Sequence, residues 1–237
     1  MTTEFSLLLG TAATLGFVHT LLGPDHYVPF IAMARARTWS SRRALAITAL
    51  CGVGHVTSSV IIGLVGLFFG VEVLKLTALE SFRGEIAGWL LFGFGLAYML
   101  WGLRRALRGK ASSLVHAHES VHEADHSHDR HSHGLHTHVH PAKANITPWV
   151  LFTIFVFGPC EPLIPVLMYP AATSSALSVF AVAMIFSLTT VGTMLVMVYA
   201  ALRGLKLVSL PRAERYAHAL AGFTVALCGA GIKFMGL

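Results

Sequence analysis

The sequence predicts an all-α polytopic membrane protein with six transmembrane helices, arranged as two inverted three-helix repeats in which helices one and four are broken. Three observations predict this fold: long apolar runs, few charges, and a resemblance between the two halves. Of 237 residues, 55% are hydrophobic and only 12% are charged, against about 25% charged in soluble domains. Apolar runs of about 20 residues indicate spanning helices. With Gly and Pro taken as helix breakers, these runs predict spans at 5–34, 44–70, 86–103, 148–170, 176–202 and 216–236.

The first and fourth predicted spans each contain a Gly-Pro pair, Gly23-Pro24 and Gly158-Pro159. Proline has no N–H to donate within a helix and disfavours helical geometry at the preceding residue. We therefore expect both helices to break at these pairs. Broken helices at mid-depth are typical of ion sites in membrane proteins.

The two halves match at a nearly constant offset. Ala87-Gly88-Trp89 corresponds to Ala221-Gly222-Phe223, and Gly95 corresponds to Gly229. Leu22-Gly-Pro-Asp-His26 likewise lies over Phe157-Gly-Pro-Cys-Glu161. Because each half has three spans, the second half must insert with the opposite orientation. The paired interruptions predict a site between the halves.

A histidine-rich segment separates the two repeats. We expect a first membrane repeat at 1–103, a flexible loop at 104–147 and a second membrane repeat at 148–237. The segment is too polar to bury a core, and its composition is typical of a metal-binding tract. It holds ten of the 14 histidines: His116, His118, His122, His126, His128, His131, His133, His136, His138 and His140.

The net charge of +6 comes largely from basic clusters that follow the first, third and fifth predicted spans. Cytoplasmic loops of membrane proteins carry an excess of Lys and Arg. We therefore expect both termini outside and the histidine-rich loop in the cytoplasm. This charge pattern is the one expected of a chain whose partner is the lipid bilayer. The net positive charge therefore does not indicate binding to nucleic acid.

The interrupted spans carry polar residues that could bind a cation. His19, Asp25 and His26 lie in span one, and His55 lies in span two. Span four adds Cys160 and Glu161. An acid in hydrocarbon is costly, about 2.5–3.5 kcal/mol at a helix centre, so it indicates a functional site. Imidazole with carboxylate suits a first-row transition metal; the alternatives are interhelical hydrogen bonding for His55 and simple packing for Cys160.

His19 together with Gly23-Pro24-Asp25-His26 resembles the signature of the nickel/cobalt transporter superfamily, and Gly158-Pro-Cys-Glu-Pro162 is similar to its NicO and UreH-like branch. The resemblance implies transport of Ni²⁺ or Co²⁺ across a bacterial inner membrane; by their chemistry the same ligands would also suit Zn²⁺. Asp25, His26, His19 and His55 would be the matching ligands. It implies a carrier rather than an enzyme, with no tightly bound cofactor. A homo-oligomer and a cytoplasmic metal chaperone are compatible partners, and the absence of an ATP-binding loop motif argues against ATP hydrolysis.

Three other interpretations compete with this one. Gly158-Pro-Cys160 also resembles membrane electron carriers related to cytochrome c biogenesis and thiol reduction, which need one reactive cysteine from each half. Asp25 stands at the position matching Cys160, so we set redox transfer aside. Export of a small sulfur-containing anion would favour basic residues, and the cores of the predicted spans contain none. A non-transporting metal sensor would need the loop but not the buried acids.

Overall fold

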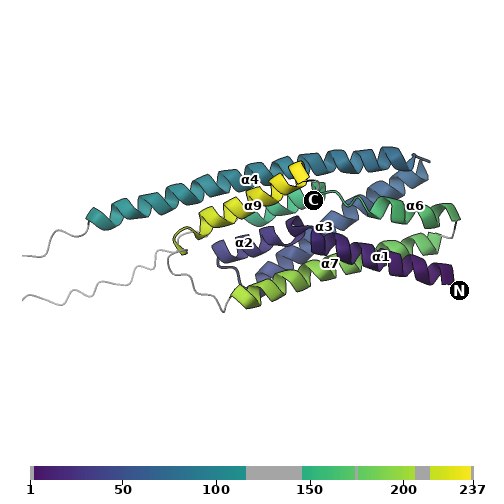
Figure 1. Ribbon diagram of the computed structural model, residues 1–237, viewed down its shortest axis with the longest axis horizontal. Helices are drawn as coiled ribbons and strands as arrows, with labels where there is room; N and C mark the ends of the chain where they lie inside the picture. The colour runs from purple at the N-terminus through teal and green to yellow at the C-terminus, as the bar shows by residue number, and fades with distance from the viewer. Residues whose placement is uncertain (1–2, 116–145, 174–175, 206–213, 236–237) are drawn as a thin grey trace, which may run out of the picture.

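The computed structural model describes residues 3–115, 146–173, 176–205 and 214–235, and within these ranges every regular element is a helix. Figure 1 shows the helices side by side in an elongated bundle, with the N-terminus at one end. In chain order they are α1 (Thr3–Leu22), the short 3₁₀ helix η1 (Pro24–His26), α2 (Val28–Ala36), α3 (Ser41–Phe68), α4 (Val73–Val115), α5 (Thr147–Phe157), α6 (Leu163–Thr173), α7 (Ala176–Leu205) and α9 (Ala217–Met235).

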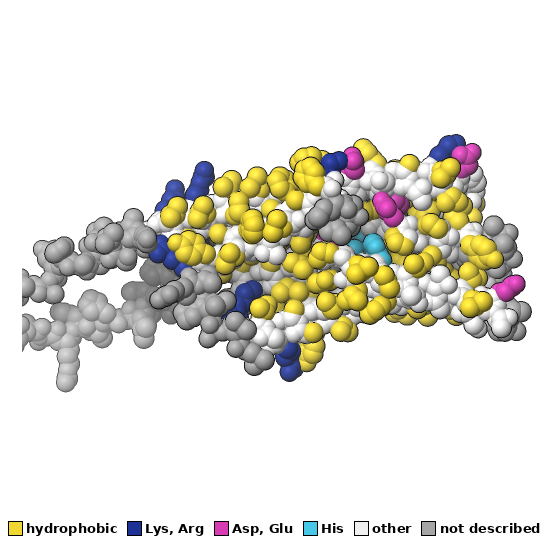
Figure 2. Space-filling model, in the orientation of Figure 1, with side chains coloured by type: hydrophobic (Ala, Val, Ile, Leu, Met, Phe, Trp, Pro, Cys, Tyr) yellow, Lys and Arg dark blue, Asp and Glu magenta, His cyan; other side chains and the backbone are white. Residues whose placement is uncertain are grey.

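Five of the described helices, α1, α3, α4, α7 and α9, are long and apolar enough to cross a membrane. The apolar helix α5 is shorter. Hydrophobic side chains cover most of the face shown in Figure 2, as expected for a surface that lies against lipid. The chain is therefore a multi-pass membrane protein, as its hydropathy predicts.

The predicted break in the first helix is confirmed. The Gly23 N–H still bonds the His19 carbonyl at 3.0 Å, and Gly23 then turns to an extended conformation with φ −89° and ψ 91°. Pro24 starts the one-turn helix η1, a position where a missing N–H costs nothing. The chain resumes as α2 at Val28.

The predicted break in the fourth helix is also confirmed. The helix α5 ends at Phe157, and Gly158 is extended with φ −59° and ψ 139°. Pro159 prevents continuation of the ladder, and α6 begins at Leu163. Each break leaves backbone carbonyls and N–H groups that need partners from elsewhere.

The predicted third span, 86–103, is too short. The helix α4 begins at Val73, and its candidate span runs to Arg108. The charged residues before residue 86 fit inside this helix because Glu80 and Arg83 pair one turn apart. The expectation that no basic residue lies in the core of a span is therefore wrong, since the Arg83 side chain is only 10% exposed. The predicted loop at 104–147 also starts too early, because α4 continues to Val115.

The helices α4 and α9 pack closely through glycines (Figure 1). A Cβ placed on Gly95 would lie 2.3 Å from the Ala226 nitrogen, and one on Gly222 would lie 2.2 Å from the Met99 nitrogen. Side chains larger than hydrogen would force the backbones apart. The glycines that mark the sequence repeat are thus the ones that form this interface.

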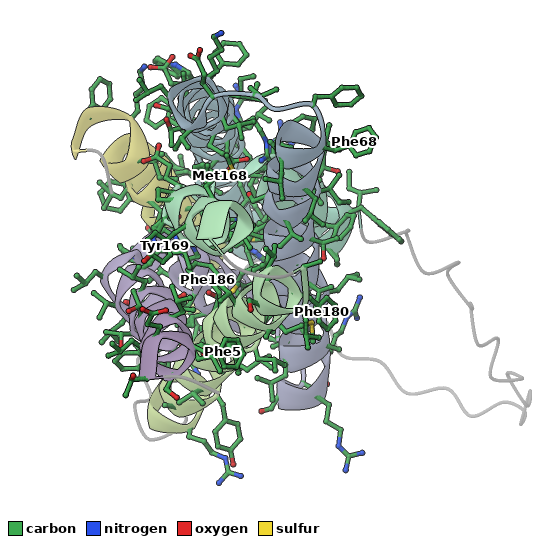
Figure 3. The ribbon with its side chains drawn as sticks, turned by 90° about the vertical axis from the view of Figure 1, so that its right-hand side faces the viewer. Phe5, Phe68, Met168, Tyr169, Phe180 and Phe186 are labelled. Atoms are coloured by element: carbon green, nitrogen blue, oxygen red, sulfur yellow. The ribbon has the colours of Figure 1, made fainter. Side chains whose placement is uncertain are left out.

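The helix α7 packs against α1, α3 and α6. Figure 3, viewed from one end of the bundle, shows Phe186 of α7 among the helices and Phe68 of α3 pointing outward at the rim. Phe186 is fully buried, whereas Phe68 is 84% exposed. Apolar side chains therefore occupy both the interior and the outer surface, which a membrane environment permits.

Candidate metal centre

Three histidines from three helical segments meet inside the bundle. His19 lies in the last turn of α1, His26 ends η1, and His55 lies in α3. One ring nitrogen from each lies within 4.8 Å of the others. The ring centroids are 4.7 Å apart for His19 and His26, and 5.2 Å apart for His26 and His55. Histidine side chains appear near the middle of the face shown in Figure 2, surrounded by hydrophobic atoms.

The backbone determines which nitrogen of two rings carries the proton. The Nδ1 of His26 lies 3.2 Å from the Gly23 carbonyl, and the Nδ1 of His55 lies 3.3 Å from the Phe155 carbonyl. A carbonyl can only accept a hydrogen bond, so each Nδ1 donates its proton. The Nε2 of each neutral ring therefore keeps a free lone pair, which is the form that binds a metal.

The Nε2 atoms of all three histidines are buried without a hydrogen-bond partner among the described residues. Buried polar atoms nearly always have a partner, and three unpartnered atoms in one cluster require an explanation. A metal ion would satisfy all three lone pairs together. Zn–N bonds of about 2.0–2.1 Å place tetrahedral ligands about 3.4 Å apart, so the rings must approach by at most about 1.4 Å.

The glycines of the two helix breaks make room for these rings. A Cβ on Gly23 would lie 2.6 Å from the His26 Nδ1, and a Cβ on Gly158 would lie 2.9 Å from the His55 Nδ1. Both distances are below any normal contact. Each break thus supplies a nearby carbonyl that orients an imidazole and a glycine that lets the imidazole approach.

Asp25 lies beside the cluster. Its Oδ1 is 3.3 Å from the His26 Nδ1, close enough for charge attraction, but without the geometry of a hydrogen bond. Asp25, His26 and His55 line a cavity of about 30 Å³, together with residues that include Leu91 and Phe155. A space of this size holds one water molecule or one ligand atom.

Two other predicted ligands lie elsewhere. Glu161 is exposed, and the structure does not bring it to the histidine cluster. Cys160 is fully buried in an apolar cluster with Val56 and Leu163, so packing describes its surroundings better than ligation. The repeat places Glu161 over His26, but the two breaks differ: His26 ends the 3₁₀ helix η1 and is buried, whereas Glu161 lies in a turn closed by the Leu163 N–H and the Cys160 carbonyl, at 2.9 Å, and is exposed. The predicted histidine sites between His116 and His140 lie outside the described residues.

Sequence reasoning missed a buried ion pair beside this site. Glu80 is completely buried and contacts Arg83, which is 8% exposed overall. The Glu80 Oε2 accepts hydrogen bonds from the Ser59 hydroxyl and the Cys160 backbone N–H, both at 2.9 Å. The signal in the sequence was an acid and a base three residues apart, the spacing of neighbours on a helix face.

Comparison with curated proteins found no match, and comparison with solved structures found none. A family model described as the transmembrane region of cytochrome c biogenesis protein matches residues 28–231. The match contains His55 and Cys160 and begins after His26. It overturns the predicted membership of the nickel/cobalt transporter superfamily and the predicted Ni²⁺ or Co²⁺ transport. The resemblance around Gly158-Pro-Cys160, which we set aside because a second cysteine is missing, indicated the right family. The chain belongs to the family of the cytochrome c biogenesis protein transmembrane region.

Proposed function

We propose that this chain serves cytochrome c biogenesis as a membrane protein that binds a copper ion, with zinc as the alternative, at His19, His26 and His55. Two observations carry the proposal: one ring nitrogen of each histidine lies within 4.8 Å of the others, and the Nε2 atom of each is buried without a hydrogen-bond partner among the described residues. Imidazole is a ligand for both metals. The proposal concerns binding of the metal within the membrane.

The local charge favours a monovalent ion. Three neutral imidazoles and the Asp25 carboxylate carry one negative charge together. Cu⁺ would bring this group to zero net charge, whereas Zn²⁺ would leave one positive charge. Because uncompensated charge is costly in a low-dielectric interior, we place Cu⁺ first.

The cysteines do not support a dithiol relay within this chain. A dithiol relay within one chain needs two cysteines that can reach each other to form a disulfide. All three cysteines are free and buried, and each lies in a different core cluster: Cys51, Cys160 and Cys228. The histidine cluster is thus the stronger candidate for the chemistry of this chain.

We also propose that the chain crosses the membrane six times, as two inverted repeats. In this reading α1 with α2, and α5 with α6, each make one interrupted crossing. The α4–α9 interface supports it: Gly95 packs against Gly222, and Gly88 packs against Gly229. The sequence repeat matches Gly88 to Gly222 and Gly95 to Gly229, so it converts each of these contacts into the other. A local two-fold axis requires this exchange.

The charge distribution supports an orientation in a bacterial inner membrane. The basic residues at the end of α2, the start of α3 and the end of α7 lie at the end of the bundle opposite the N-terminus (Figure 1). We propose that this end faces the cytoplasm, with the N-terminus outside.

Metal analysis of the purified protein tests the proposed site. The detergent-solubilised chain should hold one copper or zinc ion, measured by mass spectrometry after desalting. His19→Ala, His26→Ala and His55→Ala should each lower the content strongly. His218→Ala is the matched control because His218 bonds the Tyr98 hydroxyl on α4, at 2.8 Å, instead. The histidine-rich segment should be deleted from every variant, so that it binds no metal. A metal content that stays the same when the three histidines are replaced would contradict the proposal.

A thiol function is the second candidate, because the family match includes Cys160 at the second helix break. The two functions can be separated in cells from which the gene for this protein has been deleted, complemented with the Cys160→Ser or the His55→Ala variant. We expect Cys160→Ser to restore c-type cytochromes, measured by haem staining, and His55→Ala to fail. The reverse result would favour thiol chemistry.

A further inference from the structure

We propose that Glu80 and Arg83 of α4 are positioning residues for the metal centre: they hold the second helix break in the conformation that orients His55. The inference rests on the proposed function. It concerns residues that do not touch the three imidazoles.

The break leaves backbone groups that the helix itself cannot satisfy, and the ion pair satisfies them. The Arg83 Nη2 donates to the Val156 carbonyl at 2.7 Å and approaches the Gly158 carbonyl at 3.5 Å. The Glu80 carboxylate accepts the Cys160 N–H on the far side of the break. Glu80 and Arg83 thus hydrogen-bond the backbone on both sides of Pro159. In a membrane interior no water is at hand to replace these hydrogen bonds.

The helix α4 also lies directly against the break. A Cβ on Gly84 would lie 2.8 Å from the Pro159 ring. The contact and the hydrogen bonds together fix how the chain leaves α5. A shift of the 156–160 segment would therefore require α4 to move or the ion pair to break.

This segment orients His55 at two points. The Phe155 carbonyl receives the His55 Nδ1–H, and Gly158 leaves space beside the same nitrogen. The carbonyl fixes the tautomer and the direction of the Nε2 lone pair. Arg83 thereby acts on the ring through the backbone.

A second path runs from the ion pair to the helix that carries His55. The Arg83 Nη2 donates to the Ser58 hydroxyl at 2.7 Å, and that hydroxyl donates to the His55 carbonyl at 2.7 Å. The hydroxyl of Ser59, the residue after Ser58 in α3, donates to the Glu80 carboxylate. The pair therefore holds both the helix that bears His55 and the carbonyl that orients it.

Arg83→Gln tests this role with Cu⁺ as the probe, in chain lacking the histidine-rich segment. Affinity is measured by competition with a chromogenic Cu⁺ chelator, and ligands are counted by X-ray absorption at the copper edge. Loss of an outer partner typically weakens metal binding by about 10- to 100-fold. We expect a loss in this range and one imidazole fewer at copper, as in His55→Ala. Glu85→Gln is the control because Glu85 lies on the same helix but pairs with Lys233.

A purely structural role would lower the folded fraction but leave the folded protein with three imidazoles. If Arg83→Gln does not fold, the double variant Glu80→Met/Arg83→Met removes both charges and avoids an unpaired one; it should show the same missing imidazole. If either variant binds Cu⁺ with unchanged affinity and through three imidazoles, the positioning role is overturned and the proposed metal site is not. Absence of Cu⁺ binding in the unmodified chain would overturn the proposed function itself.

Discussion

An imidazole binds a metal through a nitrogen that carries no proton, and its orientation must be fixed before the metal arrives. In this chain two backbone carbonyls provide that control. The Gly23 carbonyl receives the His26 proton, and the Phe155 carbonyl receives the His55 proton. The Gly23 carbonyl lies at the first Gly-Pro break, and the Phe155 carbonyl lies in the last turn of α5 before the second. The breaks therefore orient two of the proposed ligands as well as interrupting the helices.

The glycines of the breaks should be sensitive to a single methyl group. Gly158→Ala should push against the His55 ring and weaken Cu⁺ binding by about 10-fold or more, in the range for disturbed outer partners. Gly23→Ala should act likewise on His26, since its Cβ would lie 2.6 Å from the ring. Chelator competition on the purified protein measures both effects.

Gly192→Ala is the control for this pair, because a Cβ on Gly192 meets nothing within 4 Å. Its affinity should match that of the unmodified chain. Equal affinity in Gly158→Ala and Gly192→Ala would show that the ring does not depend on the space at the break.

At the scale of single elements, the close contact of α4 and α9 depends on residues without side chains. Gly95→Ala or Gly222→Ala would place a Cβ against backbone atoms, which cannot rotate away. Overpacking a tight contact costs about 1–3 kcal/mol. We expect values near the upper limit, and a clearly lower midpoint of thermal unfolding in detergent.

Gly93→Ala provides the comparison on the same helix, because its Cβ meets no atom within 4 Å. It should leave the unfolding midpoint unchanged or raise it slightly, since Ala favours helix by up to about 1 kcal/mol over Gly. A similar midpoint for Gly93→Ala and Gly95→Ala would contradict the close packing of α4 and α9.

Elements governed by local chemistry could be predicted from the sequence, and those governed by contacts between distant segments could not. The breaks at Gly23 and Gly158 follow from proline at the next position, whatever surrounds it. The start of α4 was missed because its acids and bases read as a surface loop. A buried Glu80 is tolerable because Arg83 pairs with it and because the Cys160 N–H and the Ser59 hydroxyl, which come from distant segments, donate to its carboxylate.

The candidate site shows the same division. His19 and His26 could be grouped from their shared span, and the convergence of His55 depends on how α3 packs. Glu161 is a predicted ligand because it is an acid in the interrupted fourth span; the repeat equates its position with that of His26 in sequence, but it does not fix the turn that directs the side chain. Cys160 was a candidate by chemistry alone, and its burial among apolar residues comes from the tertiary fold.

At the scale of the whole molecule, charge is distributed unevenly between the two ends of the bundle. The segment between α2 and α3 lies among Arg35, Arg37, Arg42 and Arg43, whereas the turn between α3 and α4 contains Glu72 and a single nearby Lys75. The positive-inside rule then predicts that the two segments face opposite sides of the membrane. The turn between α3 and α4 should be outside.

Single cysteines can test this orientation in a background without Cys51, Cys160 and Cys228. In intact spheroplasts, a membrane-impermeant maleimide should label Glu72→Cys and leave Thr38→Cys unlabelled, because both positions are exposed but lie at opposite ends. Opening the membrane should make Thr38→Cys reactive, which controls for its accessibility. Labelling of Thr38→Cys alone in intact spheroplasts would reverse the orientation and place the basic end outside. Labelling of both would mean that the two segments share one side, which contradicts a crossing by α3.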